Sequence, residues 1–126
     1  MPPRELVLVA EMIEAAEQAR ALVDGCGVDV LRADRQRRDA LLWNRTVLGE
    51  ASAQLPEQFK SEHDDVDWTR PSALRNRIVH GYWSIDLGII HATASDDLPG
   101  YIKQLAAVLE RLTAIGEPTN EAPPPA

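Results

Sequence analysis

The sequence has a single cysteine, Cys26, and no long apolar run. One cysteine excludes an internal disulfide bond and any zinc site built from several thiolates. No apolar stretch approaches the roughly 20 residues that span a bilayer, and the N-terminal segment lacks the regions of a secretory signal peptide. We therefore expect a cytoplasmic protein without a membrane segment, in which Cys26 is a small turn residue beside Gly25 and Gly27.

The sequence also lacks an excess of positive charge, because its formal net charge is −7. Such a protein does not carry positive charge over its whole surface, as general nucleic-acid binding requires, so any contact with nucleic acid has to be local. Its basic residues are mostly Arg, whose guanidinium group can bind phosphate through paired hydrogen bonds. Two clusters are open to two interpretations, a local phosphate-binding surface or a solvated helix face with acid–base pairs. They are Arg32, Arg35, Arg37, Arg38 and Arg45, and then Arg70, Arg75 and Arg77.

Helical periodicity dominates the first half of the chain, whose 126 residues suit one domain. Apolar residues recur at steps of three and four over residues 6–23, which predicts a helix that stops at Gly25. A second, long helix is expected as far as Leu55, with Asp29 or Asp34 as its N-cap and a bend near Asp34.

Residues 57–67 are strongly polar, which predicts a connection with at most a short helical turn and a solvated His63. A third helix is expected to begin with Thr69 as its N-cap. That start places Pro71 in the first turn, where a missing N–H removes no hydrogen bond of the helix. This helix runs towards Gly81.

Two further helices are predicted by aspartates that precede apolar stretches. Asp86 caps a fourth helix, and Asp96 or Asp97 caps a fifth that ends at Gly116. Residues 117–126 contain four prolines and no large apolar residue. The sequence thus predicts an all-α protein, an antiparallel bundle of about five helices over residues 1–116 followed by a disordered C-terminal tail.

Chemistry-bearing side chains concentrate at the end of the third helix, within eight residues. Asn76 and His80 are four residues apart and share a helix face, whereas Arg75 and His80 are separated by about 140°. Arg75 can meet His80 by reaching round with its long side chain, or a second copy can bring the two together across a dimer interface. Gly81 lets the backbone turn, which displays His80 and Tyr82 where the helix ends.

These side chains suit RNA cleavage without a metal ion. A histidine can take the proton of the ribose 2′-OH or protonate the leaving 5′-oxygen, and an arginine can stabilise the charge that grows on phosphorus. The residues alone leave the alternative open that His80 is structural and that Tyr82 is a packing residue. No cluster of metal ligands at suitable spacing is apparent in the motif, so we expect no metal and no cofactor.

Residues 22–112 resemble the HepT family, a branch of the HEPN superfamily. That family carries an Arg, four to six residues, a His, any residue and a Tyr, which matches Arg75, His80 and Tyr82, with Asn76 as the polar residue after the Arg. Three further segments agree with the family pattern. They are Leu48-Gly49-Glu50-Ala51, Trp68 and Asp97-Leu98-Pro99.

The resemblance implies an all-helical homodimer that acts as a metal-independent endoribonuclease, the toxin of a type VII-like toxin–antitoxin system. It also implies a partner, a minimal nucleotidyltransferase of the MNT type, which neutralises the toxin by transferring AMP to Tyr82. Glu50 is then either a group that orients the site or an ordinary inter-helix carboxylate, and His91 is structural or exposed. Two alternatives stay open, a non-catalytic helical subunit that positions a nucleotidyltransferase and a helical nucleotide-binding module.

Overall fold

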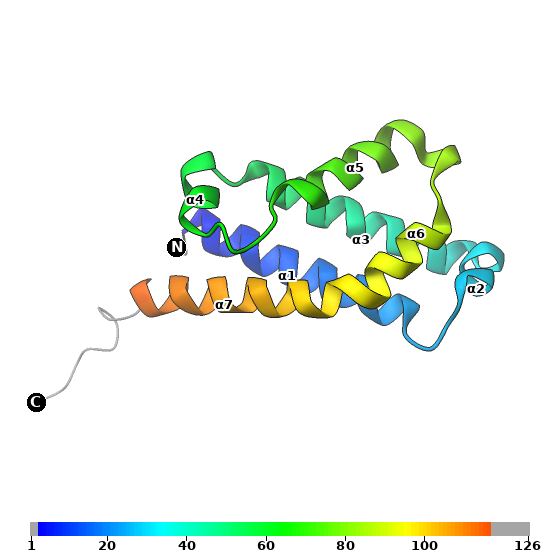
Figure 1. Ribbon diagram of the computed structural model, residues 1–126, viewed down its shortest axis with the longest axis horizontal. Helices are drawn as coiled ribbons and strands as arrows, with labels where there is room; N and C mark the ends of the chain where they lie inside the picture. The colour runs from blue at the N-terminus through cyan, green and yellow to red at the C-terminus, as the bar shows by residue number, and fades with distance from the viewer. Residues whose placement is uncertain (1–2, 117–126) are drawn as a thin grey trace, which may run out of the picture.

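The computed structural model describes residues 3–116, and these residues form helices without any strand. Four helices are long and three are short (Figure 1). The long ones are α1 (Arg4–Val23), α3 (Arg35–Gln54), α5 (Thr69–Gly81) and α7 (Leu98–Gly116), and the short ones are α2 (Val28–Ala33), α4 (Glu57–Glu62) and α6 (Leu87–Ala92). The predicted all-α class is therefore confirmed, whereas the tail predicted for residues 117–126 lies outside the described residues.

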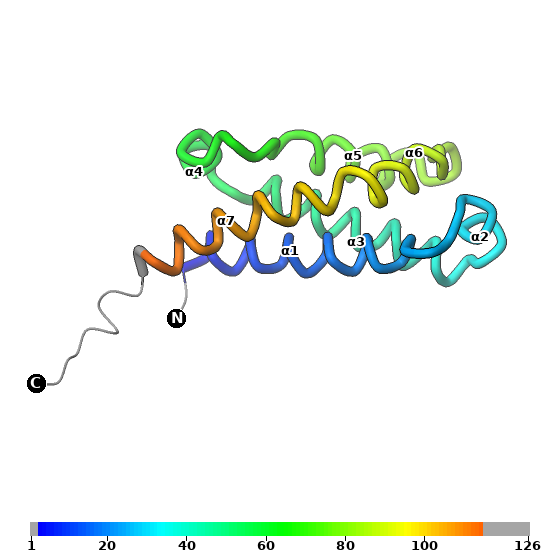
Figure 2. The backbone as a smooth tube through the Cα atoms, turned by 60° about the horizontal axis from the view of Figure 1, so that its bottom comes forward, coloured from blue at the N-terminus to red at the C-terminus, as the bar shows by residue number. Residues whose placement is uncertain are grey.

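The long helices pack side by side around one apolar core. Helix α1 contacts both α3 and α7, while α5 packs on the other side of α3 (Figures 1 and 2). Each fully buried leucine or valine contributes roughly 1.5–3 kcal/mol to folding. No helix within residues 3–116 has the length and apolar character needed to cross a membrane. The largest fully buried apolar side chains are Val9, Met12, Leu31, Leu41, Leu48, Ile90, Leu105 and Val108.

Several helix ends lie where the sequence predicts them. Helix α1 is followed by a turn in which Gly25 has a φ of 72°, a conformation that glycine adopts without strain. Asp86 caps α6, because its carboxylate accepts hydrogen bonds from the N–H groups of Gly88 and Ile89. Asp34 accepts from the N–H of Arg37 and caps α3. The predicted long second helix is thus two helices, α2 and α3, broken at Asp34 instead of bent there.

The prediction that Thr69 caps the third helix is wrong. Thr69 is already the first residue of α5, and the carboxylate of Asp67 accepts hydrogen bonds from the N–H groups of Thr69 and Arg70. Asp is as good a cap as Thr. Because Asp67 stands two residues before Thr69, it accepts the free N–H groups of the first turn of the helix. His63 is half-buried and not solvated, because its ring packs against Phe59 with centroids 4.5 Å apart.

A separate fifth helix with an Asp cap is also absent from the described residues. Helix α6 continues through a π-helical segment, Thr93–Asp97, directly into α7 (Figure 1). The N–H groups that Asp96 or Asp97 would have capped are therefore already bonded within a continuous helix. Pro99 has no N–H to offer residue 95, and the wider π turn just before it accommodates the proline.

Helices α3 and α5 approach each other closely at Gly49. A methyl group added to its Cα would overlap the carbonyl oxygen of Pro71 and the Cβ of Arg75. Both of these atoms belong to α5, and the first is backbone, so neither can move aside without shifting the helix. A glycine at this position therefore sets the distance between the two helices, and with it the place of Arg75.

We expect Gly49→Ala to lower the free energy of unfolding by about 1–3 kcal/mol, as overpacking does in a rigid interface. The intrinsic helix propensity of Ala, about 1 kcal/mol better than that of Gly, offsets only part of this. Urea denaturation measures the change. Gly100→Ala is the matched control, because nothing lies within 4 Å of the added methyl group and the substitution should be neutral or stabilising. Equal stability of the two variants would contradict the close approach.

Candidate active site

The motif occupies the last turns of α5 and the 3-10 turn that follows, Tyr82–Ser84. Helix α5 ends at Gly81, whose backbone angles, φ −143° and ψ 41°, leave the helical region. Tyr82 therefore starts a new turn while His80 stays in the last turn of the helix. All four motif residues, Arg75, Asn76, His80 and Tyr82, thus lie between the middle of α5 and the turn after it, on the side from which the chain leads to α6 (Figure 1).

Arg75 points towards α3, where it forms an ion pair with Glu50. Its Nη1 lies 2.8 Å from Oε1 of Glu50, and the Arg75 side chain is 25% exposed. The other oxygen of Glu50 accepts a hydrogen bond from Nε2 of Gln54, at 3.2 Å. Glu50 is therefore held by its own helix and holds the guanidinium group of Arg75 in turn, while Arg75 remains open to solvent on one side.

Tyr82 also points towards α3, where its hydroxyl donates a short hydrogen bond to the carboxylate of Asp39. This bond, more than burial, raises the pKa of the Tyr82 phenol, and it is the main cause that lowers the pKa of the Asp39 carboxyl. Asp39 accepts a second hydrogen bond from Nε of Arg35, at 3.3 Å. Tyr82 is consequently a protonated phenol whose proton is directed at a carboxylate.

Asp39 was not singled out by sequence reasoning, although the sequence carries a signal for it. Asp39 and Glu50 are eleven residues apart, which is about three helical turns and brings them within roughly 20° of each other on α3. Arg75 on α5 and Tyr82, in the turn that follows this helix, both point towards α3. Two acidic residues on one side of α3 thus bind two motif side chains.

Asn76 and His80 are exposed and line a different part of the surface. Both border a cavity of about 420 Å³ between the end of α5 and α6, together with Ile85 and Asp86. Arg75 does not border this cavity. As the separation of about 140° predicts, the structure brings Asn76 and His80 together and places Arg75 on another side of α5.

Large apolar side chains lie exposed beside the motif. Trp83 is 92% exposed, Val79 56% and Trp43 on α3 65%. The ring of Trp83 packs edge-on against Tyr82, with centroids 5.4 Å apart. Trp43 is four residues from Asp39 and seven from Glu50, which places it on the same stripe of α3. Apolar side chains on the surface at this density are typical of an interaction surface.

The remaining candidate side chains serve the fold. His91 joins α6 to the turn after α1, because its Nε2 lies 2.6 Å from the carbonyl oxygen of Cys26. The thiol of Cys26 in turn faces the carbonyl oxygen of Leu22, at 3.4 Å. Within residues 3–116, no group of three or more His, Cys, Asp or Glu side chains is placed to hold a metal ion. The metal-independent chemistry expected from the sequence stays a prediction.

The fold and this motif together define an all-α protein with a polar site at a helix end, flanked by exposed apolar residues. Residues 12–112 match the family described as Ribonuclease HepT-like. The chain therefore belongs to the HepT-like ribonuclease family, and its enzyme class is that of a ribonuclease.

Individual relatives agree with this family. The chain is 29% identical over 91 residues to a Thermococcus cleftensis protein named as a probable ribonuclease HepT, covering 72% of this chain and 80% of the relative. It is 24% identical over 121 residues to a Methanocaldococcus jannaschii protein named as a "putative RNase", covering 95% of this chain and 98% of the relative. No solved structure matches the chain.

Proposed function

We propose that this protein is an endoribonuclease that cleaves RNA without a metal ion through Arg75, His80 and Asn76. One observation carries the proposal. His80 and Asn76 are exposed at a cavity, where they are not needed for packing, while Arg75 is held by Glu50 on the adjoining side of the same helix. Polar side chains that line a cavity and take no part in the core are typical of a catalytic site.

In this mechanism His80 accepts the proton of a ribose 2′-OH, and the 2′-oxygen attacks the adjacent phosphorus. The 5′-oxygen leaves and takes up a proton from solvent, to which His80 then returns the proton that it accepted. Arg75 stabilises the negative charge on the pentacovalent phosphorus, and Asn76 donates a hydrogen bond from the face that it shares with His80. The products are a 2′,3′-cyclic phosphate and a 5′-hydroxyl.

The active unit in this proposal is a homodimer. One protomer presents Arg75 and His80 on different sides of α5, so a shared cleft between two copies gathers one Arg75 and one His80 on the same phosphate. The exposed side chains of Val79, Trp83 and Trp43 supply apolar area for the contact beside the motif. Their position supports a contact between copies at the site itself.

The biological role that we propose is that of a toxin in the cytoplasm, paired with an MNT-type nucleotidyltransferase that neutralises it. As AMP is transferred from ATP, pyrophosphate leaves and the α-phosphorus becomes bonded to the phenolic oxygen of Tyr82. Its hydroxyl already donates a hydrogen bond to Asp39, which supports the assignment because this carboxylate can receive the phenolic proton as the oxygen bonds to phosphorus. The added phosphate would then occupy the space around Arg75 and exclude the RNA phosphate.

The experiment that tests this function is digestion of RNA by the purified protein, with analysis of the new ends. We expect the fraction whose light-scattering mass is that of a dimer to produce 2′,3′-cyclic phosphate and 5′-hydroxyl ends, at the same rate with and without EDTA. A strict need for a divalent ion would refute the mechanism. A folded dimer that leaves RNA intact would favour the non-catalytic alternative, which the net charge of −7 and the neutralised Arg75 support.

A further inference from the structure

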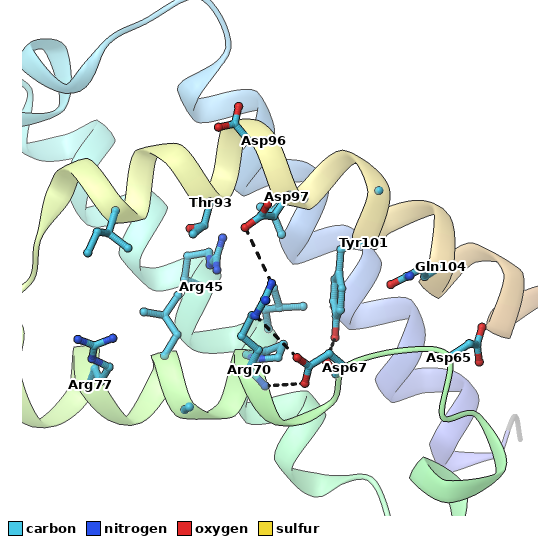
Figure 3. A pocket seen from close by; sticks show the side chains of 17 residues that line it. Arg45, Asp65, Asp67, Arg70, Arg77, Thr93, Asp96, Asp97, Tyr101 and Gln104 are labelled. Atoms are coloured by element: carbon cyan, nitrogen blue, oxygen red, sulfur yellow. Dashed lines mark hydrogen bonds and ion pairs between the residues drawn. The ribbon is translucent and has the colours of Figure 1, made fainter.

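A second, larger cavity lies between α5 and the segment formed by α6 and α7 (Figure 3). Its volume is about 590 Å³, within the range of roughly 300–1,000 Å³ that is usual for small-ligand sites. Leu48, Leu74 and Leu98 contribute apolar wall, and Tyr101 borders it with its hydroxyl bonded to the carbonyl oxygen of Asp67. The cavity exists because α5 packs on α3 and leaves α7 to pack on α1.

Arg45 is the unusual residue of this cavity. It extends from α3 and is only 7% exposed, yet its Nε and Nη1 are buried without any hydrogen-bond partner. Burial lowers the pKa of Arg45 to about 10, which still leaves the guanidinium group charged near neutral pH. A buried charge without bonded partners is costly, and native proteins retain one where a ligand completes it.

Three of the four carboxylates that border the cavity form ion pairs, and Figure 3 shows the fourth, Asp96, pointing away from Arg45 on the outer side of its helix segment. Asp67 caps α5 and lies 3.7 Å from Arg70, Asp97 lies 3.9 Å from another nitrogen of Arg70, and Asp65 pairs with Arg111 at 3.3 Å. Figure 3 shows Arg70 between Asp67 and Asp97, with Arg45 beneath Thr93. Within residues 3–116 neither Arg45 nor Arg77 forms an ion pair. Two guanidinium groups of the lining therefore remain for an anion.

This cavity adjoins the one that Asn76 and His80 border. Leu74, Arg77 and Ile89 line both of them, so Arg77 stands at their junction. A strand of RNA whose scissile phosphate lies at His80 would place a neighbouring nucleotide in the larger cavity. An isolated phosphate would satisfy Arg45 but leave most of the volume and the apolar wall unused.

We propose that the cavity between α5 and α7 binds one nucleotide of the RNA strand next to the cleavage site, with its phosphate on Arg45 and Arg77. The inference rests on the proposed function, since it supplies a subsite for the same substrate. The phosphate gives the buried guanidinium group its missing hydrogen bonds, and the apolar wall receives the sugar and base.

The test compares Arg45→Met with the parental protein in two measurements. For cleavage, Arg45→Met should raise the KM for RNA about tenfold or more, the effect of losing a charge-assisted hydrogen bond, with kcat nearly unchanged. For binding alone, the probe is a fluorescent oligodeoxynucleotide, which lacks the 2′-OH and cannot be cut by the proposed chemistry. Its Kd should rise by the same factor for Arg45→Met and stay at the parental value for Arg20→Met, a change on the exposed face of α1.

Arg20→Met is the matched control, because it removes one exposed positive charge from α1, away from both cavities. Met fills much of the volume of Arg and is apolar, so Arg45→Met should keep or raise the melting temperature. Should this variant fail to fold, Arg77→Met, which changes an exposed side chain, decides by the same comparison.

The possible outcomes distinguish failure of the proposed nucleotide subsite from failure of the proposed ribonuclease function. Equal oligonucleotide binding by Arg45→Met and Arg20→Met would overturn the subsite even if the parental protein cleaves RNA. Arg45-dependent binding by a parental protein that never cleaves RNA would support the subsite and refute the proposed nuclease. Arg45-dependent binding of a free 5′-mononucleotide, combined with Arg45-independent binding of the oligonucleotide, would overturn the assignment to an RNA strand.

Discussion

His80→Ala is expected to reduce RNA cleavage by about 10²–10⁴-fold, the usual effect of removing a general acid–base group. The imidazole is exposed at the smaller cavity and contributes nothing to the buried core, so the variant should keep its helical circular dichroism and its melting temperature. His80→Gln keeps a hydrogen-bonding side chain of similar length but cannot exchange protons near neutral pH. It should be as inactive as His80→Ala.

His63→Ala provides the control for loss of an imidazole. His63 lies at the end of α4, where its ring packs on Phe59, so this change should cost some stability and leave cleavage intact. A His80→Ala protein that folds and cleaves at the parental rate would refute the catalytic assignment. If the protein instead loses its helical structure, His80 has a structural role that its exposure does not reveal.

Local signals in the sequence predicted much of the fold, because helix ends depend on a few adjacent residues. Gly25 has a positive φ and Asp34 and Asp86 cap helices, each through its own backbone or the next three residues. Predictions failed where two local solutions competed. Asp67 caps α5 in place of Thr69, and a π turn absorbs Pro99 within a continuous helix where an aspartate cap was expected.

The arrangement of the candidate site could be predicted only in part. The spacing of Arg75 and His80 places them on different sides of one helix, and the structure agrees. Their partners on α3 depend on how closely the two helices pack, and this distance is set at Gly49 by atoms of Pro71 and Arg75 that are distant in sequence. No local pattern gives that distance.

The arginine clusters also show that contacts between helices cannot be predicted from local sequence. Arg35 pairs with Asp39 and Arg37 with Asp34, as the interpretation of a helix face with acid–base pairs predicts, whereas Arg38 donates to the backbone carbonyl of Leu31. Arg45, in the same cluster, is buried beside a cavity. Its position on the inner side of α3 becomes apparent only when α5 and α7 are in place.

Tyr82→Phe is expected to escape neutralisation by an active nucleotidyltransferase while it retains toxicity at least in part. Phe keeps the ring and its edge-on contact with Trp83 but lacks the phenolic oxygen, the atom that would accept AMP. The variant also loses the hydrogen bond to Asp39, which costs about 0.5–1.5 kcal/mol of stability. Cleavage, assigned to Arg75 and His80, should fall by no more than about tenfold.

Growth of cells that express the variant with its partner measures the escape, and the intact mass of the purified protein shows whether AMP has been added. The chain has only two tyrosines, so Tyr101→Phe is the matched control. Tyr101 donates its hydroxyl to the Asp67 carbonyl beside the larger cavity, and Tyr101→Phe should still gain AMP. If the partner rescues Tyr82→Phe cells as well as parental cells, it neutralises by binding and not by modification. If Tyr82→Phe is folded yet wholly inactive, the phenol takes part in cleavage, and the division of roles between Tyr82 and His80 is wrong.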